Sequence, residues 1–558
     1  MIIGLDVGGT HTDVVLLGNN GLMREIKVTT DSSDLFQTVL GGLEKITEGI
    51  EPAEISRVVL STTLTTNAIV QEKNPQVGMI VSGGPGIDPE LFRTNEHYFT
   101  VSGCMDHRGR ETEPVNESDI RKIADTLKKE KIRNVGIVGK FSARNPAHEL
   151  RIYEIIKDSF GKVFFGHQVS GHLNFPRRIA TTYLNATVRP IHKEFFEAVR
   201  KSLEEKGLTV PIHILKADGG TMSLESSIDF PGQSILSGPA ASVMGAIGFA
   251  TDKDDALVLD IGGTTTDIAL LVKGVPVLEP LGIRLGNYKT LIRSLKTRSI
   301  GLGGDSVVRV KDGKLEVGPD RVGPAMAYGG TFPTPTDALF VLRMVEDGDR
   351  EKSVKGIETI AKALDMSSET VASHIFDHVC GKILTEARDM TDRINSKPVY
   401  TVHELQEGYQ VKPKEILVLG GPAPYFAERF EALSDFSVSV VPRWKVANAI
   451  GAALARTTCE VTLFADTQQG IAASPEENFS ETVDKNFSKE KAIRKADELL
   501  KQKALQSGAA SIDDLETEVI EDLEFNMVHG FYTAGKNIRV KVQVKPGLIF
   551  DAGCLLDA

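Results

Sequence analysis

Residues 5–17 read LDVGGTHTDVVLL, and residues 259–271 read LDIGGTTTDIALL. Nine of the thirteen positions are identical, and two more exchange Val for Ile. Each copy contains an apolar run that ends in Asp, a Gly-Gly-Thr turn and a second apolar run. Two strands this close in sequence, joined by glycines, predict a β-hairpin. The repeat therefore predicts two related α/β lobes, each of which presents one hairpin to a shared site.

The residue types of the repeat favour phosphate binding. Glycines lack Cβ atoms, so backbone N–H groups can approach an anion, and threonine hydroxyls add donors. The turn residues expected to contact a nucleotide are Gly8, Gly9, Thr10, Thr12, Gly262, Gly263, Thr264, Thr265 and Thr266. One copy alone could be an ordinary hairpin turn; the near-identical pair with both aspartates kept argues against that interpretation. The pattern is neither a Walker A motif nor a dinucleotide-binding fingerprint.

Two aspartates in each copy are candidate catalytic residues. Asp6 and Asp260 stand just before the glycine turns. A carboxylate there can hold a hydrated Mg²⁺ that bridges to phosphate oxygens, or orient an attacking water. Asp13 and Asp267 follow the turns and are expected to buttress the hairpins or position a nucleophile. We therefore assign catalytic roles to all four and a metal-binding role to Asp6 and Asp260.

Two further glycine pairs are candidate parts of the same site. EILVLGGPAPYF (415–426) predicts a buried strand that ends in Gly420 and Gly421, where an adenine ring or ribose could lie against the backbone. The glycine- and proline-rich region 299–336 predicts loops around a site and contains Gly303 and Gly304. Each pair is weak alone, but the order of hairpin, hairpin and late glycine pair is more specific.

Composition limits the class of protein. The chain has 558 residues, which suggests three or four domains, and 41% hydrophobic and 25% charged residues, as in globular proteins. A net charge of −12 argues against nucleic acid as the main partner. No apolar stretch approaches the roughly 20 residues of a membrane span, and the N-terminus lacks a signal-peptide layout. The four cysteines show neither a disulfide framework nor a CxxC pair, so we expect a cytoplasmic protein with reduced thiols.

Strands alternate with helices, which predicts an α/β fold. We expect an N-terminal lobe over 1–180 with the first phosphate loop, a second lobe over 181–460 with the second loop and the adenosine motif, and a small α+β module over 461–558. A helical pattern over 183–206 is broken near Pro190. In the last module, a polar segment leads into a charged helix over 487–507, and a C-terminal segment alternates like an antiparallel strand.

The order of the three glycine motifs resembles the actin, hexokinase and heat-shock-chaperone ATPase superfamily, with its ribonuclease H-like two-lobed core. More narrowly, the chain resembles the hydantoinase A and 5-oxoprolinase family, which includes subunits of acetone and acetophenone carboxylases. The resemblance covers roughly residues 1–460. Besides the hairpins, it rests on STTLTTNAIV (61–70), FPRRIATTYLNATVRP (175–190), LKADGGTMSLESS (215–227), SGPAASVMGA (237–246), SIGLGGDSVVRV (299–310) and VGPDRVGPAMAYGGTFPTPTDALFVL (317–342).

The resemblance implies an ATP- and Mg²⁺-dependent hydrolase that phosphorylates the carbonyl oxygen of a cyclic amide, such as a hydantoin or 5-oxoproline, and then opens the ring. It also implies a small-molecule substrate, a separate hydantoinase B-type or carboxylase subunit as candidate partner, and a homo-oligomer. Alternatives are the ATP-using subunit of a ketone carboxylase, a small-molecule kinase and a nucleotide-dependent switch. Reductive activation of a corrinoid protein would call for an iron–sulfur module, which the scattered cysteines disfavour.

Substrate contacts are the least determined part of the prediction. The polar run after residue 61 supplies Thr63, Thr65 and Asn67, which by resemblance line the substrate side but also fit an ordinary capped helix start. Lys216 could contact phosphate and Asp218 could act as a base, or the two could form a tight Asp-Gly turn.

Other candidate site residues lie where the chain departs from the family pattern or matches it only in part. His167 falls where the family often has Ser-His-Glu, and Arg177 with Arg178 could bind a substrate carboxylate or form surface ion pairs. The family usually has His-Gly-Thr-Thr where this chain has Val59-Leu60-Ser61-Thr62-Thr63, and His11 stands where the first hairpin usually has an aromatic residue. The groups around Cys104 and His172 lack the spacing of a structural zinc site.

Overall fold

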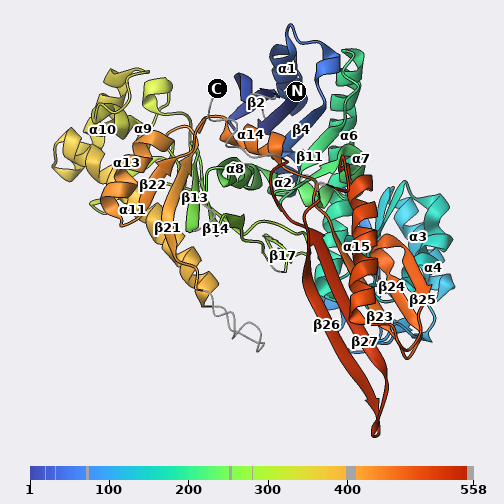
Figure 1. Cartoon of the computed structure of the whole chain (residues 1–558). Helices are drawn as coiled ribbons and strands as arrows, with labels where there is room; N and C mark the ends of the chain where they lie inside the picture. The colour runs from blue at the N-terminus through green and yellow to red at the C-terminus, as the bar shows by residue number, and fades with distance from the viewer. Residues whose placement is uncertain are drawn as a thin grey trace.

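The computed structural model describes residues 1–18, 21–31, 33–70, 75–250, 254–279, 281–396, 410–513 and 515–549 (Figure 1). The side chains of Asn67 and Val70 lie outside this description. Within the described residues, no helix combines the length and hydropathy needed to cross a membrane.

The first sheet carries the first copy of the repeat. Its strand order is β12-β11-β4-β1-β2-β3. Strands β1, β2 and β3 pair antiparallel, whereas β4 and β11 run parallel to β1. The bounds are β1 (Ile2–Val7), β2 (His11–Gly18), β3 (Gly21–Thr29), β4 (Arg57–Thr62), β11 (Ile212–Leu215) and β12 (Thr221–Ser223). Helices α1 (Leu35–Thr47) and α6 (Phe175–Glu205) pack against it and close its apolar core.

The second sheet repeats this plan around the second copy. Its order is β15-β14-β13-β21-β22, with β13, β14 and β15 antiparallel and β21 and β22 parallel to β13. The bounds are β13 (Asp255–Ile261), β14 (Thr266–Val272), β15 (Val275–Pro276), β18 (Thr297–Ile300, paired with β14), β21 (Pro413–Leu419) and β22 (Ser437–Val440). The shared order shows that the internal repeat in the sequence corresponds to a repeat of topology.

Helices cover the far side of the second sheet. They are α9 (Pro335–Val341), α10 (Arg350–Leu364), α11 (Ser368–Asn395) and α13 (Ala423–Leu433). A short hairpin of β19 (Val308–Lys311) and β20 (Lys314–Val317) packs against the same core. Their apolar side chains and those of β13, β14 and β21 form one core.

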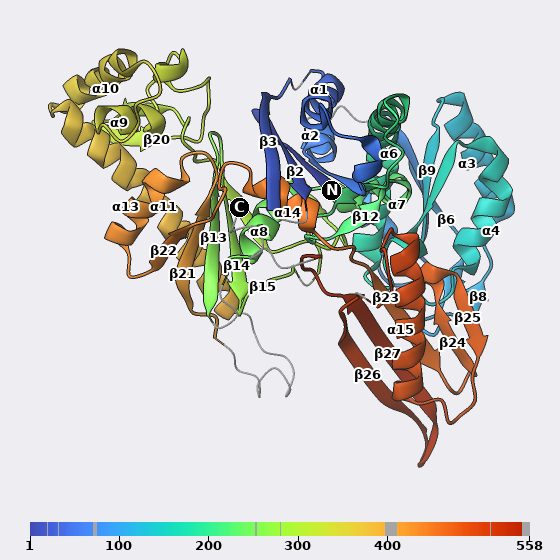
Figure 2. The ribbon, with the colours of Figure 1, turned by 45° about the horizontal axis from the view of Figure 1, so that its top comes forward.

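Two helices of small residues lie between the two sheets (Figure 2). Helix α8 (Ser237–Ile247) and helix α14 (Ala447–Leu454) cross where Gly245 meets Gly451. A Cβ atom at Gly451 would lie 2.2 Å from the backbone nitrogen of Gly245, so only glycine permits this approach. Helix α14 also packs against β1, where a Cβ at Gly4 would lie 2.3 Å from the Ala449 oxygen. The close crossing fixes the position of one sheet relative to the other.

A separate parallel sheet is inserted in the chain between β4 and β11 of the first sheet. Its order is β10-β9-β5-β6, formed by β5 (Val77–Ser82), β6 (Tyr98–Val101), β9 (Asn134–Gly139) and β10 (Lys162–Phe165). Helices α3 (Glu117–Lys129) and α4 (Ala147–Ile156) contribute to its core. The sequence predicted several of these strands but not that they leave the hairpin sheet.

Helix α6 differs from the sequence prediction because it runs through Pro190 without a break. Proline lacks the N–H that would bond to the carbonyl of Ala186, four residues earlier. The side chain of Asn134 donates to that carbonyl at 3.2 Å, which replaces the lost partner. The expected lobe boundary at 180 and 181 falls inside α6, and β11 and β12 beyond it belong to the first sheet.

The C-terminal module is an antiparallel sheet with one helix. Its order is β25-β24-β23-β27-β26, with bounds β23 (Glu460–Asp466), β24 (Ile471–Ser474), β25 (Phe479–Thr482), β26 (Thr517–His529) and β27 (Tyr532–Val544). Helix α15 (Lys489–Gln506) packs a stripe of Ala492, Ala496, Leu500 and Ala504 against it. Strands β24 and β25 fall in the segment described from sequence only as polar. The hairpin of β26 and β27 extends beyond the rest of the module (Figure 1).

Candidate functional site

Both copies of the repeat form antiparallel hairpins with the same geometry. Asp6 lies opposite Asp13 in the first hairpin, and Asp260 lies opposite Asp267 in the second. Each turn closes with one backbone hydrogen bond, from Gly8 N to His11 O at 3.0 Å and from Gly262 N to Thr265 O at 2.9 Å. No backbone hydrogen bond in the described chain uses the amides of Gly9, Thr10, Gly263 and Thr264. These turns therefore offer free N–H groups of the kind that bind anions.

The threonines of the hairpins divide into two groups. Thr264 is exposed, and Thr10 and Thr265 are half-buried, as a role in ligand contact requires. Thr12 and Thr266 are fully buried. The hydroxyl of Thr12 pairs with that of Thr30 at 2.9 Å, and the hydroxyl of Thr266 donates to Leu302 O at 2.7 Å. The expected ligand-binding role of Thr12 and Thr266 is therefore replaced by a role in fixing the hairpins.

A single asparagine links the two hairpins. The amide of Asn448 in α14 donates to Asp260 Oδ2 at 3.1 Å, and it also lies close enough to Asp6 to oppose the rise that burial causes in the pKa of that carboxyl. The hydroxyl of Ser242 in α8 donates to the same Asp260 oxygen at 2.6 Å, and the nearby hydroxyl of Ser61 acts to lower the pKa of Asp6. The two central helices thus bring the aspartates of distant repeats to one place. Sequence reasoning missed Asn448, although it is a rare polar residue in the apolar stretch 446–454.

The four carboxylates are close enough to repel one another. Burial raises the pKa of Asp6 to about 7, and the charges of Asp13 and Asp260 act in the same direction. Burial also raises the pKa of Asp267 to about 7, with a further contribution from Asp260. The Oδ1 atom of Asp267 is buried and has no hydrogen-bond partner among the residues that the structure describes. Clustered carboxylates with raised pKa values are typical of a functional site and call for a cation or a proton.

Asp13 differs from the other three because it has a cationic partner. Lys27 of β3 donates to Asp13 Oδ1 at 2.7 Å. Burial raises the pKa of Asp13, and the Lys27 ammonium opposes that shift. For Asp267, the hydroxyl of Ser299 is the one influence among the described residues that acts to lower its pKa. Lys27 therefore ties Asp13 to β3, and the expected roles of Asp13 and Asp267 stay predictions.

The loop 301–306 supports the second hairpin. Gly304 N donates to Gly262 O at 2.9 Å, and Asp305 N donates to Gly263 O at 2.7 Å. A Cβ atom at Gly303 would lie 2.5 Å from Gly262 O, so this glycine permits close contact with the turn. The N–H of Gly303 donates to Ser306 Oγ, and that of Gly304 donates to Gly262 O, so neither amide is free for a ligand. These two residues therefore position the hairpin.

Asp305, which sequence reasoning did not single out, faces the first hairpin. Arg321 donates to Asp305 Oδ2 at 3.0 Å, and burial raises the pKa of Asp305 against that ion pair. Burial lowers the pKa of His11, and the charges of Asp305 and Arg321 act on its ring from the second lobe. The imidazole of His11 also contacts Thr10 Oγ1 at 3.3 Å. His11 is therefore the part of the first turn that approaches the opposite lobe.

The glycine pair after β21 lies beside Asp260. Gly420 has φ +95°, and a Cβ atom there would lie 2.3 Å from Ile261 O and 2.7 Å from Asp260 Oδ1. A Cβ atom at Gly421 would meet nothing within 4 Å. Gly420 is therefore required by the fold, whereas Gly421 borders open space next to the second hairpin, where the predicted nucleotide would lie.

The oxygen-only donor set suits Mg²⁺ better than a transition metal. Within the described chain, no three or more His, Cys, Asp or Glu side chains are arranged to hold a metal ion by themselves. Mg²⁺ commonly takes one or two carboxylates and completes its shell with water and phosphate oxygens. Asp6 and Asp260 fit that mode, and their metal-binding role stays a prediction.

The candidates after β4 lie close to the first hairpin. Helix α2 (Leu64–Val70) begins directly after β4, and Thr63 Oγ1 donates to Val7 O at 3.4 Å. Thr65 is buried, and its hydroxyl contacts Ser234 Oγ at 3.0 Å and His192 Nδ1 at 3.3 Å. Thr63 thus adjoins the hairpin, Thr65 is held in the interior, and the side chain of Asn67 is outside the described residues.

Lys216 and Asp218 form a buried pair at 3.2 Å. Lys216 Nζ donates to Thr458 O at 2.7 Å, and Thr458 Oγ1 donates to Asp218 Oδ2 at 2.9 Å. Burial would raise the pKa of Asp218, but Lys216 and Arg293 hold it below its ordinary value. Both residues line a cavity beside the C-terminal module, where Asp218 is a stable anion.

His167 and the arginine pair have structural partners. His167, in the short helix α5 (Gly166–Val169), is fully buried and lies 2.6 Å from Glu149 Oε2 through Nδ1. Arg178 is equally buried and donates to Ser142 and to the Lys140 carbonyl. Arg177 donates to the carbonyls of Leu281 at 2.7 Å and Thr290 at 2.8 Å. We expected the two arginines to bind substrate or to form surface ion pairs. Their contacts instead hold α6 against neighbouring segments.

Two family models match most of the chain. The hydantoinase/oxoprolinase model matches residues 178–461, and the model of the hydantoinase/oxoprolinase N-terminal region matches residues 2–160.

Curated relatives align over long stretches at low identity. Caprolactamase subunit alpha of Pseudomonas jessenii is 25% identical over 487 residues, which cover 79% of this chain and 68% of the relative. The acetone carboxylase beta subunit of Xanthobacter autotrophicus is 23% identical over 588 residues, which cover 94% of this chain and 76% of the relative. The 5-oxoprolinase of Saccharomyces cerevisiae is 27% identical over 419 residues, which cover 62% of this chain and 32% of the relative. The first two relatives are subunits of larger enzymes.

Solved structures share the fold. A nucleotide-free acetone carboxylase chain superimposes with a TM-score of 0.71 at 19% identity and covers 98% of this chain and 88% of its own. A chain of the ATP-dependent caprolactamase from Pseudomonas jessenii gives a TM-score of 0.71 at 20% identity, with 98% and 87% covered. With both family models matched in order, the chain belongs to the hydantoinase/oxoprolinase family.

Proposed function

We propose that this chain is an ATP-dependent enzyme that opens a cyclic amide by activating its carbonyl oxygen. The observation that carries the proposal is the pair of matching hairpins whose aspartates meet through Asn448. An amide is a poor electrophile, and phosphorylation of its oxygen makes that oxygen a good leaving group. Relatives named as an ATP-dependent caprolactamase and a 5-oxoprolinase support this substrate class.

The chain's residues would share the work as follows. Free amides in the two turns bind phosphate oxygens, and Asp6 and Asp260 hold Mg²⁺, which neutralises phosphate charge when bound. Ser61 would stabilise the charged form of Asp6, and Ser242 and Asn448 would keep the Asp260 carboxylate oriented. Asp267, whose pKa burial raises to about 7, would take a proton from a nucleophilic water. Gly421 leaves room for the adenosine part.

The overall reaction balances simply. ATP, two waters and the cyclic amide yield ADP, phosphate and the open-chain amino acid. The γ-phosphoryl group passes to the amide oxygen and releases ADP. One water adds to the activated carbon, the ring C–N bond breaks and the amine nitrogen takes a proton. The second water cleaves the resulting acyl phosphate to the carboxylate and phosphate. Thr63, next to the first hairpin, is the best-placed of the predicted substrate-side residues.

A second candidate function follows from other relatives. The acetone carboxylase beta subunit aligns with 94% of this chain, and the acetophenone carboxylase gamma subunit of Aromatoleum aromaticum is 27% identical over 397 residues. In a carboxylase-type enzyme, the same hairpins would activate a ketone or bicarbonate. Such a role would require a partner subunit, as the relatives' names imply for them.

The test is ADP release by the purified chain with Mg²⁺ and ATP. Substrates are caprolactam, 5-oxoproline, hydantoin and acetone with bicarbonate, each with product analysis by mass spectrometry. We expect one cyclic amide to raise ADP release and to yield its amino acid, and Asp260→Asn to abolish both. Asp119→Asn, a half-exposed surface carboxylate, is the matched control. A carboxylated or stably phosphorylated product would overturn the amidase proposal in favour of a carboxylase or a kinase.

A further inference from the structure

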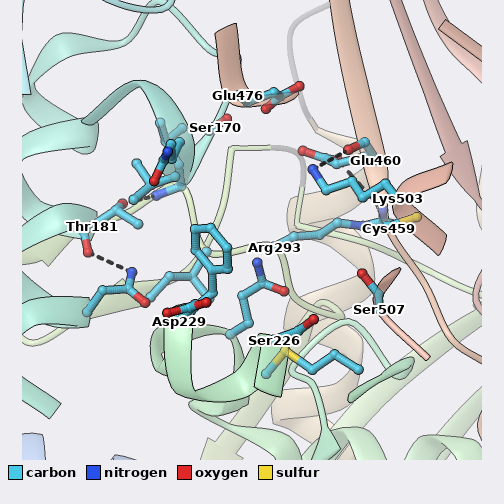
Figure 3. A pocket seen from close by; sticks show the side chains of 18 of the residues that line it. Ser170, Thr181, Ser226, Asp229, Arg293, Cys459, Glu460, Glu476, Lys503 and Ser507 are labelled. Atoms are coloured by element: carbon cyan, nitrogen blue, oxygen red, sulfur yellow. Dashed lines mark hydrogen bonds and ion pairs between the residues drawn. The ribbon is translucent and has the colours of Figure 1, made fainter. Parts of the chain in front are cut away.

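A cavity of about 510 Å³ lies where the C-terminal module meets the rest of the chain (Figure 3). Its walls come from β10 and α6, from the turn after β11 with helix α7 (Leu224–Asp229), and from β23 and α15. This volume is in the range of small-molecule sites. The cavity is lined by none of the hairpin residues, so it is separate from the predicted nucleotide site.

Arg293 supplies unused hydrogen-bond donors to this cavity. None of its three guanidinium nitrogens makes a hydrogen bond within the described chain, and all three are buried. Its Nε lies 3.5 Å from Asp218 and its Nη1 lies 3.6 Å from Glu460, which are ion-pair distances without hydrogen-bond geometry. Figure 3 shows the side chain extending across the cavity toward Glu460 and Lys503. A guanidinium in this state is best satisfied by a planar, bidentate acceptor such as a carboxylate.

The other cations of the cavity already have partners. Lys216 donates to Thr458 O and Asp218, and Lys503 donates to Glu460 O at 3.0 Å and to Glu477. Lys162 donates to Asp229 Oδ1 at 2.6 Å. Arg293 is therefore the cation that a carboxylate ligand would engage.

The overall charge of the lining favours a ligand without net charge. The ionisable lining residues are the bases Lys162, Lys216, Arg293 and Lys503 and the acids Asp218, Asp229, Glu460, Glu476 and Glu477. A dianionic phosphate would meet five acids, whereas a zwitterion adds no net charge. Asp229 lines the α7 side of the cavity, and no described residue other than Lys162 forms an ion pair with it. Its second oxygen can accept from an ammonium group.

We propose that this cavity binds a small amino acid, whose carboxylate pairs with the guanidinium of Arg293 and whose ammonium group lies toward Asp229. The ligand class agrees with the proposed function, because opening a cyclic amide releases an amino acid, and the proposal rests on that function for the choice of probe. The geometry of the cavity is independent of it. Since β23 and α15 form one wall, the bound amino acid joins the C-terminal module to the body of the chain.

The test is isothermal titration of the full chain, without nucleotide, with 6-aminohexanoate, glutamate and hexanoate. We expect at least one of the two amino acids to bind, and hexanoate to bind roughly 10-fold more weakly than 6-aminohexanoate because it lacks the ammonium group. Arg293→Gln should weaken amino-acid binding by about 10- to 100-fold, and Arg293→Lys, which keeps the charge, by less. Arg309→Gln removes an exposed cation paired with Asp320 and should bind as the wild type does.

Three results would overturn the proposal. They are no binding of either amino acid to the wild type, equal binding of hexanoate and 6-aminohexanoate, and unchanged affinity in both Arg293 variants. If Arg293→Gln does not fold, Arg293→Lys and the hexanoate comparison still decide. A parallel titration with MgATP separates the two proposals, because failure of MgATP to bind refutes the proposed function and leaves the amino-acid site standing.

Discussion

The two adjacent glycines after β21 should respond in opposite ways to the same substitution. In Gly420→Ala, the new methyl group would lie 2.3 Å from Ile261 O and 2.7 Å from Asp260 Oδ1, on a backbone with φ +95°. A left-handed backbone costs a non-glycine residue about 1–2 kcal/mol, and overpacking typically adds about 1–3 kcal/mol. We therefore expect Gly420→Ala to lose about 2–5 kcal/mol of stability in the second lobe and to displace the Asp260 carboxylate.

Gly421→Ala is the matched partner. Its methyl group would meet nothing within 4 Å, so stability should stay within roughly 1 kcal/mol of the wild type or rise slightly. If the adenosine part of ATP lies there, the same methyl group should weaken MgATP binding about 10-fold. The assays are urea unfolding followed by circular dichroism and titration calorimetry with MgATP. Wild-type stability in Gly420→Ala, or wild-type MgATP affinity in Gly421→Ala, would refute the reasoning.

Two other perturbations test other parts of the structure. Asn448→Ala removes the hydrogen bond that orients Asp260, worth about 1.5–3 kcal/mol for a charged acceptor, together with a polar group beside Asp6. Substrate-stimulated ADP release should therefore fall at least about 10-fold, and an unchanged rate would contradict the linking role. Burial lowers the pKa of His192 to about 3, below the value of about 6.5 expected in the unfolded chain. Only the unfolded state then gains a proton as pH falls below 6.5, so His192 should remove roughly 2 kcal/mol of stability between pH 7 and pH 5. Urea unfolding at both pH values should show a smaller loss for His192→Gln than for the wild type, and equal losses would show that His192 titrates normally in the folded protein.

The hairpins could be predicted because their geometry is encoded locally. A Gly-Gly-Thr turn between apolar runs has few alternatives to a hairpin, and the repeat of the phrase predicted the repeat of topology. The alternation of side chains along a strand could also have shown which threonines of the hairpins do not face a ligand. Thr12 and Thr266 each precede an aspartate by one residue, and successive residues point to opposite faces of a strand. Because the aspartates face the shared site, these threonines had to face the interior.

The remaining features depend on long-range contacts that leave weak traces in one sequence. Pro190 predicts a break in a helix, and only the position of Asn134, more than fifty residues earlier, explains why the helix continues. Asn448 meets Asp6 and Asp260 because α8 and α14 cross at two glycines. The arginine at position 293 has no motif around it, and its free donors become evident only when the C-terminal module closes the cavity.

The most direct test of the central claim is titration of MgATP into the purified chain and into Asp6→Asn and Asp260→Asn, with Asp119→Asn as control. We predict that ATP binds to the wild type and the control only when Mg²⁺ is present, and that each hairpin variant loses at least about 10-fold in affinity, or about 1.4 kcal/mol. Binding that is equal in all four proteins, or independent of Mg²⁺, would show that the paired hairpins are not the nucleotide site.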